Sequence, residues 1–425
     1  MTSTLFTNVN ILDGASNGPV SGEVVVADGR ITAVEPGGGI VPRADHRVID
    51  GKGRTLMSGL CDAHTHFTWN SGGDLDALAN MQLEEHMLVA VQSARILLDS
   101  GYTMCVGAAS AKERIDIVIR NAINDGTIVG PRYLANAPEL ATPAGVLVHG
   151  ITRVVSGVED VRRATREICG MGADVVKLIL SGESITQRVW AKDTYMTDGE
   201  VAAAVQEAHR VGKRVAAHAR STESIKQCLR LGVDIVYHAS YIDDEAADMF
   251  EARKDDVFVA PGLHWLIATL EEAAAYGYPR EAAEAVGYKE ELDESIVGMT
   301  ELHRRGVKVL PGGDYGFAWT PHGTNARDLE HFVERLGFTP MEAIHAATVL
   351  GGEIFLRPNE LGRVAPGYLA DLLLVDGDPS TNVAVLQDHD KLVGIMKDGA
   401  FHKDPDVTDL LAGRTAPELA GAAAR

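Results

Sequence analysis

Two histidines separated by one residue close an apolar segment near the start of the chain, in the run Gly59-Leu-Cys-Asp-Ala-His64-Thr-His66. On a β-strand, residues two apart point to the same face, so both imidazoles can bind one metal ion. Alone this pair is a weak signal, because strand alternation produces such pairs freely.

Further metal-type ligands end other apolar segments. His218 closes Arg214-Val-Ala-Ala-His, His238 closes Ile235-Val-Tyr-His, and Asp314 follows Val309-Leu-Pro-Gly-Gly. In a barrel of parallel strands, the carboxyl ends of the strands form the face where active sites are built. A single histidine at a strand end would be an ordinary polar residue, but five ligand-type side chains on four strand ends predict a metal site.

Lys177 lies in the apolar run Asp174-Val-Val-Lys-Leu-Ile-Leu, where a buried ammonium would be costly. One resolution is a salt bridge to a carboxylate such as Glu183. The other is carbamylation, in which the neutral amine reacts with carbon dioxide and the resulting carboxylate bridges two cations. Burial favours the neutral, nucleophilic amine, so we expect the carbamate.

The elements that must position these residues alternate between short apolar runs and helix-period segments. The expected strands are Leu56–His66, Tyr102–Gly107, Arg132–Ala137, Val175–Leu180, Arg214–His218, Ile235–His238, Val257–Pro261 and Lys308–Gly312. Eight such steps predict an α/β protein with a (β/α)8 TIM barrel over residues 58–362. An open doubly wound sheet would need a glycine-rich phosphate turn after its first strand, and the sequence has none.

Both ends of the chain are rich in strand and turn signals, including a hairpin turn at Asp28-Gly29. We therefore expect residues 1–57 and 363–413 to form one small β-sandwich domain, with residues 414–425 as a tail.

Composition limits the class of partner. The formal charge of −21 disfavours binding to nucleic acids and anionic membranes. The four cysteines are widely spaced and form no Cys-x-x-Cys pair, and neither a secretory leader nor an apolar membrane span is visible. We expect a cytoplasmic enzyme with a small-molecule substrate, assembled as a homo-oligomer.

As a set, these residues resemble the ligand pattern of the amidohydrolase superfamily, and within it the imidazolonepropionase-like, Xaa-Pro dipeptidase-like branch of binuclear hydrolases. The run from Leu361 (Leu-Gly-Arg-Val-Ala-Pro-Gly-Tyr) is similar as well. The resemblance implies two divalent metal ions, bridged by carbamylated Lys177 and a hydroxide. It also implies that Asp314 moves the proton of that hydroxide's parent water to the leaving nitrogen. The implied ligands are His64, His66 and Asp314 for one metal, and His218 and His238 for the second. Zn²⁺ is the expected metal, although the ligands also suit Mn²⁺ or Co²⁺.

Aromatic residues follow several predicted strands and suggest an apolar wall for the substrate, although loops over a barrel also need a packed core. The candidates for this wall are the four tryptophans, Trp69, Trp190, Trp265 and Trp319, and Tyr195 is a candidate for binding a substrate carboxylate or carbonyl. His149 is a candidate to polarise the substrate carbonyl, or is an ordinary loop histidine. Arg220 is a candidate for binding a substrate carboxylate, or forms a surface ion pair.

Four functions compete. We expect hydrolysis of a C–N bond in an amide, carbamate or urea with an aromatic or apolar group. A Xaa-Pro-type dipeptidase or N-acyl-amino-acid hydrolase would need a cation such as Arg220 or Arg188 for the terminal carboxylate. A mononuclear deaminase would not need Lys177 as a ligand. A non-catalytic assembly protein is disfavoured because all six ligand positions are filled.

Overall fold

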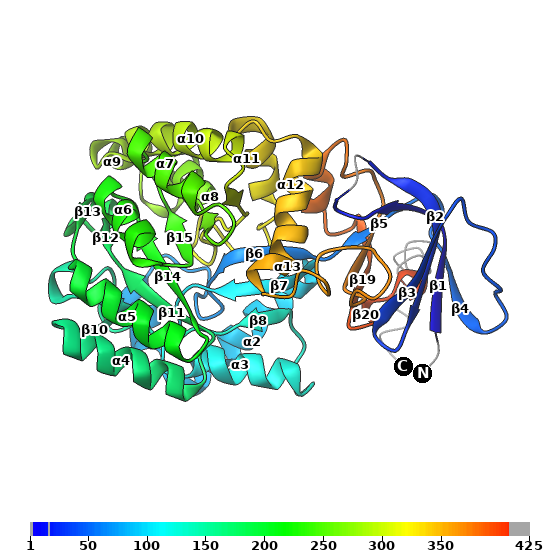
Figure 1. Ribbon diagram of the computed structural model, residues 1–425, viewed down its shortest axis with the longest axis horizontal. Coiled ribbons are helices and arrows are strands. Elements are labelled where there is room, and N and C mark those ends of the chain that lie inside the picture. Colours follow the sequence, from blue (N-terminus) through cyan, green and yellow to red (C-terminus); the bar gives the residue numbers. More distant parts are fainter. Residues whose placement is uncertain (1–2, 16–17, 408–425) are drawn as a thin grey trace. The chain divides into compact units, whose positions relative to one another are not determined.

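The structure, a computed structural model, describes residues 3–15 and 18–407 and divides the chain into two compact units (Figure 1). One unit contains Met1–Leu60, Leu98–Thr103 and Thr339–Arg425, and the other contains Cys61–Leu97 and Met104–Phe338. The tail expected over residues 414–425 lies outside the described residues. Among the described residues, no helix is both long and apolar enough to cross a membrane.

The first unit is built on a sheet of eight strands contributed by both ends of the chain. Asp28 and Gly29 both have positive φ, of 50° and 78°, as a two-residue hairpin turn of type I′ requires, and the expected hairpin is confirmed. Apolar side chains from both ends share one core, in which Phe6, Leu56 and Leu374 are buried. The strands are β1 (Ser3–Leu12), β2 (Val20–Ala27), β3 (Arg30–Pro36), β4 (His46–Asp50), β5 (Thr55–Ser58), β18 (Leu372–Val375), β19 (Leu392–Lys397) and β20 (Ala400–Lys403).

The second unit alternates parallel strands with helices, and in Figure 1 its helices lie outside its strands. One sheet has the order β6-β7-β8, and a second has the order β10-β9-β11-β14-β15-β16-β17. The N–H of Ala63 donates to the carbonyl of Pro311 (3.0 Å), and the N–H of Asp174 donates to that of Ala135 (2.7 Å). The first bond links edge strand β6 to the residues after β17, and the second links the residue after β8 to the residue before β11, the third strand of the larger sheet. The strands are β6 (Leu60–Thr65), β7 (Tyr102–Gly107), β8 (Arg132–Leu134), β9 (Leu140–Ala141), β10 (Arg153–Val154), β11 (Val175–Ile179), β14 (Arg214–Ala219), β15 (Ile235–His238), β16 (Phe258–Ala260) and β17 (Lys308–Val309).

A short antiparallel hairpin, β12 (Ser181–Glu183) and β13 (Val189–Thr194), follows β11. The α-helices of the described residues are α1 (Leu75–Asn80), α2 (Leu83–Asp99), α3 (Ile115–Asn124), α4 (Val158–Met171), α5 (Asp198–Arg210), α6 (Thr222–Leu231), α7 (Asp244–Ala252), α8 (Leu263–Glu271), α9 (Arg280–Ala285), α10 (Tyr288–Arg304), α11 (Arg327–Arg335), α12 (Pro340–Ala347) and α13 (Val349–Ile354). Helices α12 and α13 belong to the first unit.

The strand expected over Leu56–His66 is divided in the structure into β5 and β6, with Gly59 between them. A Cβ atom at Gly59 would lie 2.2 Å from the hydroxyl oxygen of Thr103, so only glycine fits this close approach. The consequence for the site is that β6 starts afresh at Leu60 and ends at Thr65, with His64 and His66 at its carboxyl end.

Candidate metal centre

Three predicted ligands, His64, His66 and Asp314, meet at the carboxyl ends of β6 and β17. One carboxylate oxygen of Asp314 lies 3.0 Å from Nε2 of His66 and 3.6 Å from Nε2 of His64. Nδ1 of His66 lies 3.4 Å from the carbonyl of Ala109, and a proton on Nδ1 would leave Nε2 as an electron-pair donor to a metal ion. The three side chains therefore present one set of ligand atoms that could bind a metal ion.

His218 and His238, which end neighbouring strands β14 and β15, form a second pair of imidazoles beside this group. Their ring centres are 4.4 Å apart, and the ring of His238 lies 5.1 Å from that of His64. Nε2 of His218 lies 3.1 Å from the carbonyl of Gly182 and can donate a hydrogen bond to it. Nδ1 of the same ring then carries the lone pair that can bind a metal ion. Both ring nitrogens of His238 are buried without a hydrogen-bond partner among the described residues. Buried polar atoms are rarely left unpaired, so this ring fits a missing ligand such as a metal ion.

The backbone at these residues is itself unusual. His238 and Asp314 have φ angles of 70° and 62°, in the left-handed region that costs non-glycine residues energy. Gly262 packs against His238 so closely that a Cβ atom there would lie 2.7 Å from Nδ1 of the imidazole. Strained residues held by tight packing are typical of functional sites.

Lys177 lies in β11 and lines the same cavity as the histidines. Its amine sits over the ring of Tyr237, 4.6 Å from the ring centre, and among the described residues it has no ion pair or hydrogen bond. Glu183, the carboxylate we considered as its partner, is paired with Arg220 instead. Burial lowers the pKa of Lys177, against the attraction of Glu139 and Asp314. A neutral amine is the form that reacts with carbon dioxide.

Burial also controls the protonation of the imidazoles. It lowers the pKa of His64, His218 and His238 well below the usual histidine value, so their lone pairs are available at neutral pH. Burial alone would raise the pKa of Asp314, but the neighbouring His64 and His66 hold it below its usual range. Neutral imidazoles beside an ionised carboxylate are the donor set that Zn²⁺, Mn²⁺ or Co²⁺ takes.

The metal-type ligands form the floor of a cavity of about 440 Å³ in the second unit. Trp69, Trp265 and Trp319 line it together with Phe317, whereas Trp190, the fourth tryptophan expected in this wall, is not among the described residues that line the cavity. The ring centres of Trp265 lie 4.5 Å from Phe317 and 5.3 Å from Trp319. One wall is thus a packed aromatic surface. His149 also lines the cavity, at an exposed position.

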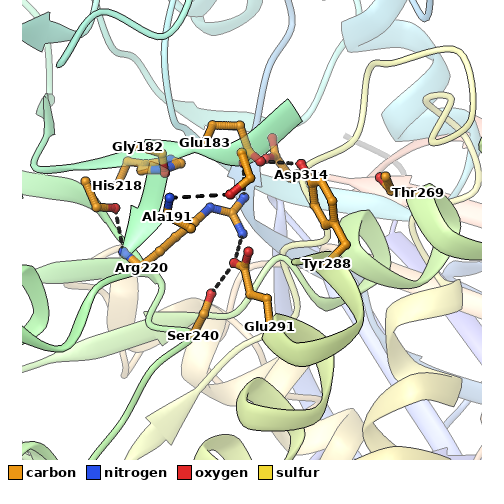
Figure 2. Close-up of polar contacts among 12 residues, drawn as sticks. Gly182, Glu183, Ala191, His218, Arg220, Ser240, Thr269, Tyr288, Glu291 and Asp314 are labelled. Carbon is orange, nitrogen blue, oxygen red and sulfur yellow. Dashed lines mark hydrogen bonds and ion pairs between the residues drawn. The ribbon is translucent and has the colours of Figure 1, made fainter. Parts of the chain in front are cut away.

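Arg220 is not among the described residues that line this cavity. Its side chain is fully buried, and its guanidinium donates to Glu183 and to Glu291, the latter at 2.5 Å (Figure 2). Tyr288 also donates to Glu183, and Ser240 donates to Glu291 at 2.7 Å. The expectation that Arg220 binds substrate needs correction, because two carboxylates inside the protein already occupy its guanidinium. Burial favours the neutral form of Arg220, but the two carboxylates raise its pKa above the usual value.

Tyr195 also lies outside the described lining of the cavity. Its hydroxyl accepts a hydrogen bond from the N–H of Trp190 (3.0 Å) and donates one to a carboxylate oxygen of Asp193 (3.3 Å). Its ring packs against the apolar cluster that contains Val146. The expected substrate contact is therefore replaced by a role in fixing the β12–β13 hairpin.

Glu139 is a cavity residue that the sequence reasoning did not single out. It is buried, accepts a hydrogen bond from Thr152 (2.9 Å), and lies shortly after β8. Glu139 lies beyond the carboxyl end of a strand, and the metal-type histidines were predicted from positions at strand ends. The same sequence signal could therefore have identified Glu139.

The chain is similar to known proteins in both sequence and structure. The model of the amidohydrolase family matches residues 55–401. The chain is 27% identical to ochratoxinase of Aspergillus niger over 384 residues, which cover 83% of this chain and 76% of that protein. It is similar to the crystal structure of a Xaa-Pro dipeptidase with methionine bound in its active site, with a TM-score of 0.84 and 26% identity, covering 95% of this chain and all of the other. A putative prolidase from Bifidobacterium longum gives a TM-score of 0.82 at 27% identity, covering 96% and 98% of the two chains.

Fold and site therefore define an enzyme, a hydrolase acting on carbon–nitrogen bonds. The chain belongs to the amidohydrolase family.

Proposed function

We propose that this enzyme hydrolyses the C–N bond of an amide, carbamate or urea in a small molecule that carries an aromatic or apolar group. The observation that carries the proposal is the cavity itself, which combines a floor of metal-type ligands with a wall of indole and phenyl rings. Flat aromatic walls bind flat apolar groups through a large contact area.

We propose that the site holds two divalent cations. His64, His66 and Asp314 would hold one, His218 and His238 would hold the other, and a carbamate on Lys177 would supply further ligand oxygens. The nitrogens of His238 and the amine of Lys177, which have no hydrogen-bond partner within the described part of the chain, support this assignment. When bound, such cations lower the pKa of water and polarise the carbonyl that is attacked.

The remaining roles belong to side chains. Asp314, ionised and 3.0 Å from Nε2 of His66, accepts the proton of the attacking water and delivers it to the leaving nitrogen. His149 donates a hydrogen bond to the substrate carbonyl from the cavity wall. Trp69, Trp265 and Trp319 hold the apolar group and exclude water from the reacting bond.

We also propose that the second unit is a closed (β/α)8 barrel and that the first unit is a β-sandwich. The hydrogen bonds that link β6 to the residues after β17, and the residue after β8 to the residue before β11, support a closed (β/α)8 barrel. The shared core of the eight strands from the two chain ends supports a β-sandwich.

The test is metal counting on the purified protein, paired with hydrolysis of a panel of anilides, aryl ureas, aryl carbamates and dipeptides. We expect two metal ions per chain, loss of turnover after chelation, and recovery when Zn²⁺ is returned together with bicarbonate. Full activity in thoroughly metal-free protein would refute the mechanism, and turnover of the dipeptides alone would refute the substrate class.

A further inference from the structure

The β12–β13 hairpin forms one side of the cavity and carries a cation to it. Glu183, Ile185, Thr186 and Arg188, around the tip of this hairpin, all line the cavity. Gln187, with φ of 51°, makes the tight turn immediately before Arg188. The hairpin therefore contributes a guanidinium to a wall that is otherwise mostly apolar or acidic.

The charged groups of the cavity can be assigned one by one. Asp314 is paired with His64 and His66, and Glu183 accepts bonds from Arg220 and Tyr288. The other two carboxylates accept hydrogen bonds as well, Glu139 from Thr152 and Asp74 from the N–H of Ala77.

Among the described residues, Lys177 and Arg188 are the two lysine or arginine residues that line the cavity. Lys177 is buried among the metal-type ligands. Arg188 is exposed, and within the described part of the chain its guanidinium has neither an ion pair nor a hydrogen bond.

We propose that Arg188 is a specificity-determining residue that binds a carboxylate of the substrate. This inference rests on the proposed function and narrows it to amides whose amine or acyl part carries a carboxylate group. Arginine presents a planar fork of donors that matches a carboxylate with two parallel hydrogen bonds. On a chain with a formal charge of −21, an anionic substrate needs such a local cation to enter.

The buried network behind the hairpin supports this role. Figure 2 shows the guanidinium of Arg220 between Glu183 and Glu291, with Tyr288 on the other side of Glu183. Glu183 thus ties the hairpin to the residue after β14 and to the start of α10. The N–H of Arg188, five residues further along the hairpin, donates to the hydroxyl of Thr186 (3.3 Å), whereas its side chain has no hydrogen bond or ion pair among the described residues.

The experiment compares two substrates that differ only in charge, N-benzoyl-L-phenylalanine and its carboxamide, with the holoenzyme. In Arg188→Met we expect kcat/KM for the acid to fall about 10- to 100-fold, mainly through KM, because a hydrogen bond to a charged group is lost. We expect the carboxamide to change less than about twofold. Arg188→Lys keeps the charge without the fork and should recover part of the loss. Arg163→Met, an exposed arginine on α4, is the matched control and should leave both substrates unchanged.

An equal effect of Arg188→Met on both substrates, or no effect on either, would overturn the role of Arg188 while leaving the proposed function intact. If the wild type cleaves neither compound, the proposed function fails on this substrate class, and calorimetric binding of the two compounds decides the inference separately. Tighter binding of the acid that disappears in Arg188→Met supports a carboxylate site. Equal binding of the acid by both proteins refutes it.

Discussion

Replacing Arg220 by methionine tests the buried charge network directly. The side chain of Arg220 is fully buried, and those of its partners Glu183 and Glu291 are 11% and 1% exposed. Removing one member of a buried pair typically costs about 3–5 kcal/mol, because it leaves a buried charge uncompensated. The variant can escape that cost only by protonating a carboxyl group.

Protonation sets the size and the pH dependence of the effect. Consider a carboxyl group whose pKa is about 4.3 in the unfolded state and which must be protonated in the folded state. Its protonation lowers the free energy of unfolding by about 4 kcal/mol at pH 7.5 and by about 1 kcal/mol at pH 5. Burial already raises the pKa of Glu183 with Arg220 in place. A carboxyl whose folded pKa is raised loses stability as pH rises above its unfolded pKa. The free-energy difference between variant and wild type should therefore grow from pH 5 to pH 7.5.

The assay is urea unfolding followed by tryptophan fluorescence at both pH values. All four tryptophans, at positions 69, 190, 265 and 319, belong to the unit that contains the network, so the signal reports that unit. Arg230→Met is the control, because Arg230 forms exposed ion pairs worth about 0–1 kcal/mol. A cost below about 1 kcal/mol for Arg220→Met, or one independent of pH, would refute the assignment of a buried, ionised trio.

Two further outcomes follow from the site, and a third concerns His331, a buried histidine on α11 whose Nε2 lies 3.1 Å from Nδ1 of His264. Asp314→Asn should lower kcat by about 10²- to 10⁴-fold, because the group that moves the proton is lost; steady-state kinetics beside metal analysis checks this, and an active variant with full metal content would contradict it. Trp265→Ala should lower kcat/KM for a benzoyl amide about tenfold more than for the acetyl analogue, since the ring contributes an aromatic contact; an equal loss for both would argue against an aromatic subsite. His331, whose pKa burial lowers to about 4, should destabilise the fold as pH falls from about 6.5 towards 4, by up to about 3 kcal/mol. His331→Gln should flatten that part of the stability profile in urea unfolding, and an unchanged profile would show that this imidazole does not titrate as described.

The grouping of His64, His66 and Asp314 could be predicted because strand alternation and strand ends are visible in the sequence. Side chains two residues apart on a strand point to the same face of the sheet, and the carboxyl ends of parallel strands in a barrel lie at the same rim. These rules need no knowledge of which helix packs where. Three of the four tryptophans expected in the aromatic wall, Trp69, Trp265 and Trp319, follow a strand and line the cavity, whereas Trp190 lies within β13 and is not among the described lining residues.

The place of Arg220 could not be predicted in this way. It follows β14 just as a cavity residue would, but Glu291 on α10, 71 residues further along the chain, accepts a bond from its guanidinium. Only the packing of that helix against the hairpin decides whether the guanidinium faces the cavity or the protein interior. Likewise Tyr195 and Arg188 lie on the same β12–β13 segment, and the register of that hairpin determines which of them reaches the cavity.

The pairing of β5 with β18 has a consequence for synthesis on the ribosome. Ser58 pairs with Leu372, about 300 residues later in the chain. Strand β5 therefore cannot pair with β18 until the ribosome has synthesised those residues. At about 5–20 residues per second, that delay is roughly 15–60 s. During this interval the edge of β5 is open, and an open edge strand is a template for pairing with other nascent chains. A chaperone that covers this edge would therefore raise the yield of native enzyme more than one that acts after release.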